Sequence, residues 1–242
     1  MIDLLTSHAS VRKYTDEPIS DETFHRLLHS AQHAASSHFV QAYSVIQVKD
    51  EEKKQALGKL SKNERQFDTA ALSLLFCADL KRGQQAVEMH DKDIVGDTVE
   101  DFIVATADTA ILAQNFVVAA EAEGYGICYI GGVRNNPKEI SKLFELPDFV
   151  IPLFGMTVGV PAEKNEVKPR LPVESIVHVD GYDEHKYMEQ LRAYDATFNE
   201  YYQRRTRNKK NMTWSETMAN FWPKKRRAHM KEFVQSKGFL KD

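Results

Sequence analysis

The stretch VATADTAILAQNFVVAAEAEGYGICYIGGVRNNP (104–137) decides the fold of this 242-residue chain. Its first part, 104–123, is rich in alanine and apolar on most faces, which is typical of a helix buried in a core or a subunit interface. The helix is expected to end at Gly124. Residues 126–130 then form an apolar run of strand length, and Pro137 is well placed to start a helix over 138–144. This stretch predicts helices packed on a sheet.

The rest of the chain extends the same pattern. Ser20 is a suitable N-cap for a helix with apolar residues at helical spacing, and a polar helix is expected over 51–60. Further strands are predicted at 43–48, 72–78 and 153–160. Beyond Pro172 an aromatic helix is expected over 183–205 and a helical region over 214–239. We therefore predict a single α/β domain over 1–242, with 183–242 as a basic, helical C-terminal excursion.

The composition is that of an ordinary globular protein, with 42 % hydrophobic and 28 % charged residues. No signal peptide is recognised, and no membrane partner is expected because no apolar run was judged long enough to span a bilayer. Cys77 and Cys128 both lie in apolar runs, so buried thiols in a reducing cytoplasm are predicted. The absence of a Cys-x-x-Cys pair argues against a structural metal site.

Charge is distributed unevenly along the chain. Residues 203–242 hold 12 Lys and Arg against three Asp and Glu, whereas 1–202 hold 20 against 32. Three interpretations stay open for this basic tail: packing on the protein's own dimer, capture of a phosphorylated nicotinamide coenzyme, or nucleic-acid binding through 224–227. The last interpretation lacks interleaved aromatic residues, since only Trp222 is close.

Two short basic motifs indicate a phosphate site. His8-Ala9-Ser10-Val11-Arg12 and Lys168-Pro169-Arg170 each combine cations with hydrogen-bond donors. Between them, Tyr129-Ile130-Gly131-Gly132-Val133-Arg134 has adjacent glycines that would let a planar or anionic ligand approach the backbone.

Together these motifs resemble the nitroreductase family, in its branch of flavin reductases and oxygen-insensitive NADPH nitroreductases. Further matching stretches follow in order along the whole chain: 14–19, 35–41, 76–79, 153–155, 171–172, 201–205 and 213–215. The resemblance implies a three-layer α+β fold with a mixed central sheet flanked by helices. It also implies a homodimer with FMN at the interface and a C-terminal excursion that reaches onto the partner subunit.

The resemblance carries site roles over to matching positions of this chain. The FMN phosphate would be held by Arg12, Lys168 and Arg170, with His8 and Ser10 completing that pocket, and Ser36 would reach the flavin from the other chain. The isoalloxazine would lie along Tyr129, Ile130, Gly131 and Gly132. Gln66 is a further candidate. His8 is expected to have a hydrogen-bonding, structural role.

Relatives commonly carry Gln where this chain has Glu64, and a carboxylate beside a reduced flavin is unfavourable unless it is protonated or faces solvent. Arg134 is expected either to add charge near the flavin or to cap a carbonyl near the turn at 135–137.

The resemblance also implies how the protein works. Arg205 and Lys210 match positions that bind the NADPH 2′-phosphate, and Arg207 and Lys209 lie between them. Electrons would pass from NADPH through FMN to a small acceptor, such as a nitroaromatic, a quinone or a flavin, by two-electron ping-pong hydride transfer. No catalytic side chain is predicted, because the chemistry takes place on the cofactor. The alternative function is nucleic-acid binding through the basic tail.

Overall fold

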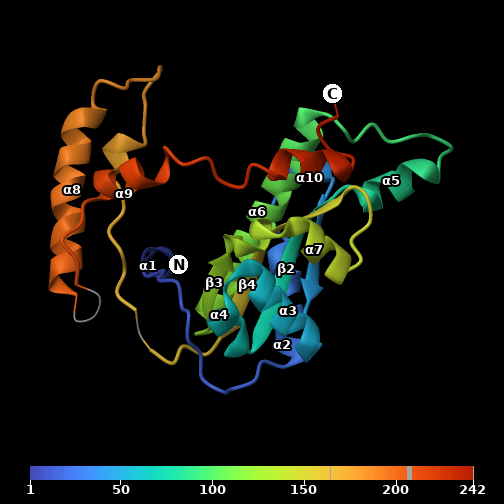
Figure 1. Ribbon diagram of the computed structural model, residues 1–242, viewed down its shortest axis with the longest axis horizontal. Helices are drawn as coiled ribbons and strands as arrows, with labels where there is room; N and C mark the ends of the chain where they lie inside the picture. Colours follow the sequence, from blue (N-terminus) through green and yellow to red (C-terminus); the bar gives the residue numbers. More distant parts are fainter. Residues whose placement is uncertain (164, 206–208, 242) are drawn as a thin grey trace. The chain divides into compact units, whose positions relative to one another are not determined.

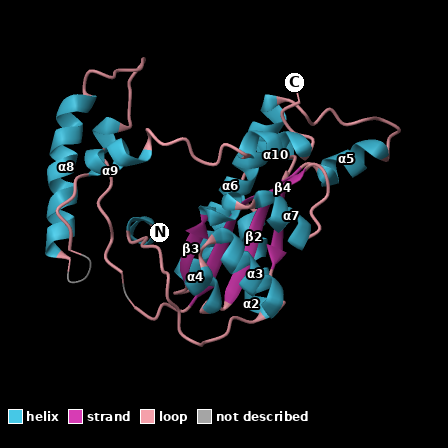
Figure 2. Cartoon of the chain, viewed as in Figure 1, coloured by secondary structure: helices cyan, strands magenta, loops and turns pink. Residues whose placement is uncertain are grey.

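The computed structural model describes residues 1–163, 165–205 and 209–241. The chain divides into two compact units, Met1–Asn165 with Arg227–Asp242 and Glu166–Arg226. The first unit contains the sheet and most of the helices, and the second is helical (Figures 1 and 2). The expected single domain over 1–242 stays a prediction.

The first unit is built on a four-stranded sheet with strand order β1-β2-β4-β3. The strands are β1 (Tyr43–Gln47), β2 (Leu72–Asp79), β3 (Gly126–Ile130) and β4 (Val150–Gly159). Each differs from its predicted range by at most three residues at either end. β2 and β4 are the central pair and are apolar almost throughout, as expected for strands that are covered on both faces.

The sheet is antiparallel, which corrects the prediction of a mixed sheet. β1 pairs with β2, β2 with β4, and β3 with β4, each in antiparallel register. β2 and β3 run in the same direction and are joined through a helix, as in a parallel crossover. However, β4 lies between them, so no two described strands of like direction are neighbours.

Helices cover both faces of this sheet, so the unit has the expected three layers (Figure 2). Alternate residues of β2 show this: Leu74 and Phe76 pack with α2 (Asp21–Gln32) and α6 (Val99–Ala122). Leu75 and Cys77 face the opposite layer. That layer contains α3 (Glu51–Ser61), α4 (Glu64–Asp68) and α7 (Pro137–Leu143).

α6 begins five residues earlier than predicted, because Thr98 and Asp101 form a capping box at its N-terminus. By length and composition it is apolar enough to cross a membrane, contrary to the expectation from the sequence. In the fold it is a core helix, with Leu112, Phe116 and Val117 buried against the sheet.

The predicted helical region 214–239 is two separate helices. α9 (Trp214–Phe221) belongs to the second unit, whereas α10 (Met230–Ser236) belongs to the first. Pro223 follows α9, and Arg227 has a left-handed backbone with φ of 47°, so the helical path is interrupted between them. The chain then returns to the first unit, where three of its side chains are buried: Phe233, Val234 and Phe239. This unit also contains α1 (Ile2–Thr6), η1 (Ser37–Phe39), α5 (Lys81–Glu88) and η2 (Gly131–Asn135).

The second unit packs α8 (Tyr187–Arg204) against α9 around an aromatic cluster, and also contains η3 (Val173–Ser175). Tyr194, Phe198, Tyr201 and Tyr202 are buried in this cluster and Trp214 packs against it. Ser215 N donates to Asp195 Oδ1 at 2.8 Å, which ties the two helices together. The aromatic stripe predicted over 187–201 is thus largely internal to the unit.

Candidate functional site

The segment that follows α1 lies beside the outer edge of the sheet at β3. Val11 N donates to Ile127 O at 2.8 Å, and Thr15 N donates to Val160 O at 2.9 Å. A glycine is needed at 126 for this approach, because a Cβ there would lie 2.4 Å from a Val11 methyl group. The structure therefore brings the motif His8 to Arg12 next to the strand that leads into Tyr129 to Arg134.

Tyr14 anchors this segment. It is buried, and its hydroxyl lies 2.8 Å from Val11 O, 3.0 Å from Thr157 O and 2.9 Å from Thr157 Oγ1. Burial raises the pKa of Tyr14 well above its ordinary value, although the hydrogen bond to Thr157 opposes this shift.

His8 makes one polar side-chain contact, since its Nδ1 lies 2.6 Å from Glu121 Oε1 on α6, and both side chains are half-buried. Its structural role at the phosphate pocket stays a prediction. Ser10 is half-buried, and its carbonyl accepts a hydrogen bond from Asn165 Nδ2 at 3.0 Å. Both residues are held by neighbours within the first unit.

Arg12 differs from its neighbours because it is exposed. Its charge lowers the pKa values of Tyr14 and Cys128, against the larger effect of burial on each. Among the residues that the structure describes, its guanidinium has no hydrogen bond or ion pair. An unpaired cation at the edge of β3 is suited to an anionic ligand.

The glycine motif at the end of β3 is tightly packed. Ile130 is buried and Tyr129 is half-buried, with its hydroxyl 3.5 Å from Gln114 Oε1. Burial raises the pKa of Tyr129, and the Glu121 carboxylate adds to the rise. Gly132 is required by the fold itself, because a Cβ there would lie 2.1 Å from Ser61 O.

Gly131 is constrained differently, since a Cβ there would meet only the guanidinium end of Arg134, at 3.2 Å. That guanidinium donates to Leu153 O on β4. It does cap a carbonyl, but on β4 and not at the predicted turn. Burial lowers the pKa of Arg134, and the nearby positive charge of Arg227 lowers it further.

The other predicted flavin contacts of the first unit lie on the loop that follows α2 and on the short helix α4. Ser36 is half-buried, and its Oγ accepts a hydrogen bond from Gln41 N at 3.2 Å. Gln66 is half-buried on α4, and its Nε2 donates to Asn63 Oδ1 at 3.3 Å. Glu64 is exposed, so its carboxylate is solvated.

In the second unit the predicted cations gather around Tyr202. Lys168 Nζ lies 5.9 Å from the centre of the Tyr202 ring, and the Arg205 guanidinium lies 5.6 Å from the same ring. The backbone N–H of Lys210 donates to Tyr202 O at 3.3 Å. Arg170 donates to Lys168 O at 2.6 Å and is exposed. Arg207 lies outside the described residues.

These positions fall into two groups, one in each unit. Arg12, His8 and Ser10 share the edge of β3 with Tyr129, whereas Lys168 shares the Tyr202 ring with Arg205. The joint phosphate site made from both groups stays a prediction. Sequence reasoning missed Tyr202, which was visible only as part of an aromatic stripe, and Asp108, a lone carboxylate in an apolar helix.

One spacing relevant to metal binding was overlooked. His25, His29 and His33 recur every four residues along α2 and its C-cap, a spacing that can place two imidazoles on one metal. The rings of His29 and His33 have centroids 5.1 Å apart. Within the described part of the chain no group of three or more His, Cys, Asp or Glu could hold a metal ion.

Comparison with known proteins identifies the family. Models described as the nitroreductase family and the nitroreductase family C-terminal domain match residues 5–160 and 168–242. The chain belongs to the nitroreductase family. Its three-layer α+β architecture is the fold of that family.

Individual relatives cover almost the whole chain. A protein of Pseudomonas sp. (strain G-1) named CR(VI) reductase is 54 % identical over 237 residues, 98 % of either chain. A Bacillus subtilis (strain 168) protein named FMN reductase (NADPH) is 39 % identical over 100 % of this chain and 98 % of its own. The solved structure of B. megaterium NfrA1 has a TM-score of 0.96 at 43 % identity over 99 % of both chains.

Proposed function

We propose that this protein is an FMN-dependent NADPH oxidoreductase that reduces nitroaromatics, quinones or flavins by two-electron, ping-pong hydride transfer. The observation that carries this proposal is Arg12, an exposed cation beside the β3 motif with no ion pair among the described residues, in a chain that belongs to the nitroreductase family. FMN is the cofactor and NADPH the electron donor.

The donor set at the edge of β3 fits FMN. A phosphate ester requires cations and neutral donors together, and Arg12 has no competing carboxylate among the described residues. Ser10 adds a hydroxyl beside it. At Gly131 the space of a side chain is lined by the Arg134 guanidinium, 3.2 Å from where a Cβ would lie, so a ligand at this backbone would meet a cation. The resemblance also assigns Lys168 and Arg170 to the phosphate, and that assignment stays a prediction.

FMN, when bound, accepts and releases electrons in pairs, so the protein need only bind, orient and shield it. Tyr129 is a neutral phenol near pH 7, as any tyrosine is, and burial raises its pKa further, so it would add no negative charge beside the flavin ring. Glu64 is turned to solvent, so its carboxylate does not oppose a reduced flavin.

Preference for NADPH is assigned to Arg205 and Lys210. A 2′-phosphate carries nearly two negative charges, and a planar guanidinium binds it through paired hydrogen bonds. Arg205 is half-buried against Tyr201 and Tyr202, which restricts its motion before the coenzyme arrives. The relative named FMN reductase (NADPH) supports this coenzyme choice.

Chromate is a second acceptor class, supported by the 54 % identical relative named CR(VI) reductase. We expect it to use the same reduced flavin as the organic acceptors. No observation favours nucleic-acid binding by the basic tail, where the Arg226 guanidinium lies 3.6 Å from the centre of the Phe221 ring.

We also infer a homodimer with FMN at its interface. α6 exposes Val99, Ile103 and Ile111, which are apolar residues that a partner subunit would cover. Sedimentation of the purified protein measures its oligomeric state, and a dimer is expected at micromolar concentration.

A cytoplasmic location agrees with Cys77 and Cys128, both of which are free thiols.

Anaerobic stopped-flow spectroscopy tests the function directly. The purified protein is expected to show a flavin absorption band that bleaches much faster with NADPH than with NADH. Comparable bleaching by both coenzymes would support the proposed oxidoreductase activity and contradict the proposed preference for NADPH. A colourless protein that takes up no added FMN would exclude the proposed function.

A further inference from the structure

The loop between α2 and β1 has an unusual backbone. His38, Phe39 and Gln41 have φ values of 46°, 60° and 56°, so three non-glycine residues of four are left-handed. Residues with a Cβ adopt this region rarely and at an energetic cost. Such a conformation persists only where surrounding contacts impose it.

The loop is not held by packing of its own side chains. His38, Phe39 and Val40 are all exposed, Phe39 to 79 %. Hydrophobic burial therefore cannot account for the strained conformation. Polar contacts to the backbone must do so.

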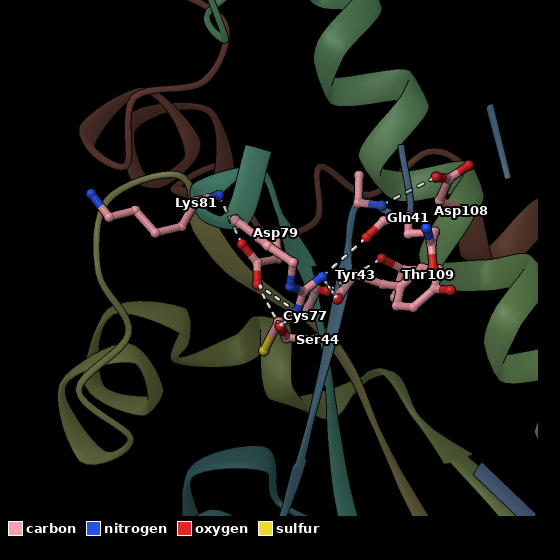
Figure 3. Close-up of polar contacts among 10 residues, drawn as sticks. Gln41, Tyr43, Ser44, Cys77, Asp79, Lys81, Asp108 and Thr109 are labelled. Atoms are coloured by element: carbon pink, nitrogen blue, oxygen red, sulfur yellow. Dashed lines mark hydrogen bonds and ion pairs between the residues drawn. The ribbon is translucent and has the colours of Figure 1, made fainter. Parts of the chain in front are cut away.

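Asp108 supplies those contacts from α6. Its side chain is fully buried, and its two carboxylate oxygens accept from two backbone N–H groups: Oδ1 from Ser37 at 2.8 Å and Oδ2 from Ala42 at 3.2 Å. These two N–H groups flank the left-handed residues His38, Phe39 and Gln41. Figure 3 shows Asp108 beside Gln41 and Tyr43. One carboxylate thus fixes both ends of the loop.

A second charged group holds the C-terminal end of the loop. Arg82 Nη1 donates to Gln41 O and to Tyr43 O, both at 3.2 Å. Arg82 is oriented in turn by Asp79, 3.8 Å away, and Asp79 also accepts hydrogen bonds from Ser44 Oγ and Lys81 N (Figure 3). The loop is therefore tethered from α6 and from the start of α5.

A buried carboxylate with no cationic partner is costly to keep in an apolar helix, and backbone N–H groups compensate it. We propose that Asp108 is a positioning residue for flavin binding, which holds loop 36–42 so that Ser36 is presented to FMN. Ser36 directly precedes the first tethered residue, Ser37, and its Oγ accepts a hydrogen bond from Gln41 N inside the tethered segment at 3.2 Å. This inference rests on the proposed function, because Ser36 is the predicted flavin contact.

The test is the dissociation constant of FMN, measured by titrating the apoprotein and following quenching of flavin fluorescence. In Asp108→Asn one oxygen becomes an NH₂ group, which faces a backbone N–H and cannot accept from it. We expect the FMN dissociation constant to rise about tenfold, which corresponds to about 1.4 kcal/mol.

Thr109→Val is the matched control. Thr109 is the next residue of α6 and is also fully buried. Its Oγ1 lies 2.7 Å from Ala105 O and 3.3 Å from Cys77 O on β2, and no hydrogen bond of its side chain to the loop is found in the described residues. Figure 3 shows Thr109 and Cys77. Its FMN dissociation constant should stay within twofold of wild type, although thermal unfolding of the apoprotein shifts. Equal weakening by both variants would reduce Asp108 to a general stabilising residue and overturn the proposal.

A pair of surface variants tests the same loop without altering the core. His38→Val places a β-branched residue at a left-handed position and should raise the FMN dissociation constant about fivefold, whereas His38→Asn tolerates that conformation and should leave it unchanged. Unchanged FMN binding in Asp108→Asn and His38→Val, with wild type binding normally, would overturn the role of Asp108 alone. A wild-type protein that binds no FMN would overturn this proposal and the proposed function together.

Discussion

Arg12 and His8 show how two residues of one short motif, four positions apart, take different roles. The His8 ring lies 2.6 Å from Glu121 Oε1, so its polar atom is used inside the fold. Arg12 is exposed and keeps its charge for an external anion. Nothing in the sequence of the motif separates these two roles, because the distinction depends on a carboxylate 113 positions away from His8.

Arg12→Ala should weaken FMN binding. Loss of one or two charge-assisted hydrogen bonds to the phosphate corresponds to about 10- to 100-fold in the FMN dissociation constant. Fluorescence titration of the apoprotein measures this. Lys13→Ala is the control, because Lys13 is the neighbouring exposed cation, and equal effects of the two variants would contradict a specific phosphate contact.

The buried Tyr14 side chain leads to a prediction about the free energy of unfolding at alkaline pH. Burial raises the pKa of Tyr14 above its ordinary value of 10.0. Above about pH 10 the unfolded chain therefore releases a proton that the folded protein retains, so the free energy of unfolding falls as pH rises. Tyr14→Phe should lose about 1–2 kcal/mol near neutral pH, because its three hydrogen bonds are removed, and should show a shallower decline above pH 10.

Urea unfolding at several pH values measures this difference. Tyr125→Phe serves as the control, because the Tyr125 side chain is partly exposed and makes no hydrogen bond in the described structure. A decline for Tyr14→Phe as steep as that of wild type would show that other groups cause the alkaline loss of stability.

At the scale of elements, local sequence signals were most reliable where burial is uniform. β3 matches its predicted range, and β2 differs by one residue, because a continuous apolar run has few alternatives. The helical region predicted over 214–239 contains two helices, α9 and α10, which pack in different units. Helical propensity cannot show which hydrophobic surface a segment will meet.

The C-terminal end of α8 carries a prediction about coenzyme choice. Arg205 follows α8 directly and lies on the Tyr201 and Tyr202 rings. Arg205→Ala should raise KM for NADPH about tenfold or more and leave KM for NADH nearly unchanged, because only NADPH has the 2′-phosphate. Steady-state kinetics with both coenzymes measures this. Arg204→Ala is the matched control, one residue earlier and exposed, and parallel effects on both coenzymes would rule out the assignment.

At the scale of the whole molecule, the chain leaves the first unit after residue 165 and returns at 227. The returning segment is part of that unit's core. Phe239 is fully buried, and its ring lies 6.2 Å from those of Phe102 and Phe149. The C-terminal segment around Phe239 therefore stabilises the core of the first unit together with Phe102 and Phe149, which lie far earlier in the chain.

Phe239→Ala should lower the free energy of unfolding by about 3–5 kcal/mol, the usual cost of removing a buried phenylalanine. Chemical denaturation followed by circular dichroism measures it. Trp222→Ala, at a side chain that is 73 % exposed, should change the free energy of unfolding by less than about 0.5 kcal/mol. Comparable losses in both variants would contradict a core role specific to Phe239.

The sequence by itself determined the order of the strands and main helices along the chain, the family resemblance and the positions of the basic motifs. These follow from local periodicity and short-range residue patterns. Only the tertiary structure decided that Arg12 has no ion pair within the described part of the chain, that Gly132 packs on Ser61 O, and that Lys168 and Arg205 share the Tyr202 ring. It also decided that the sheet is antiparallel and that Asp108 holds loop 36–42. Each of these depends on contacts between residues far apart in the chain, which local patterns do not encode.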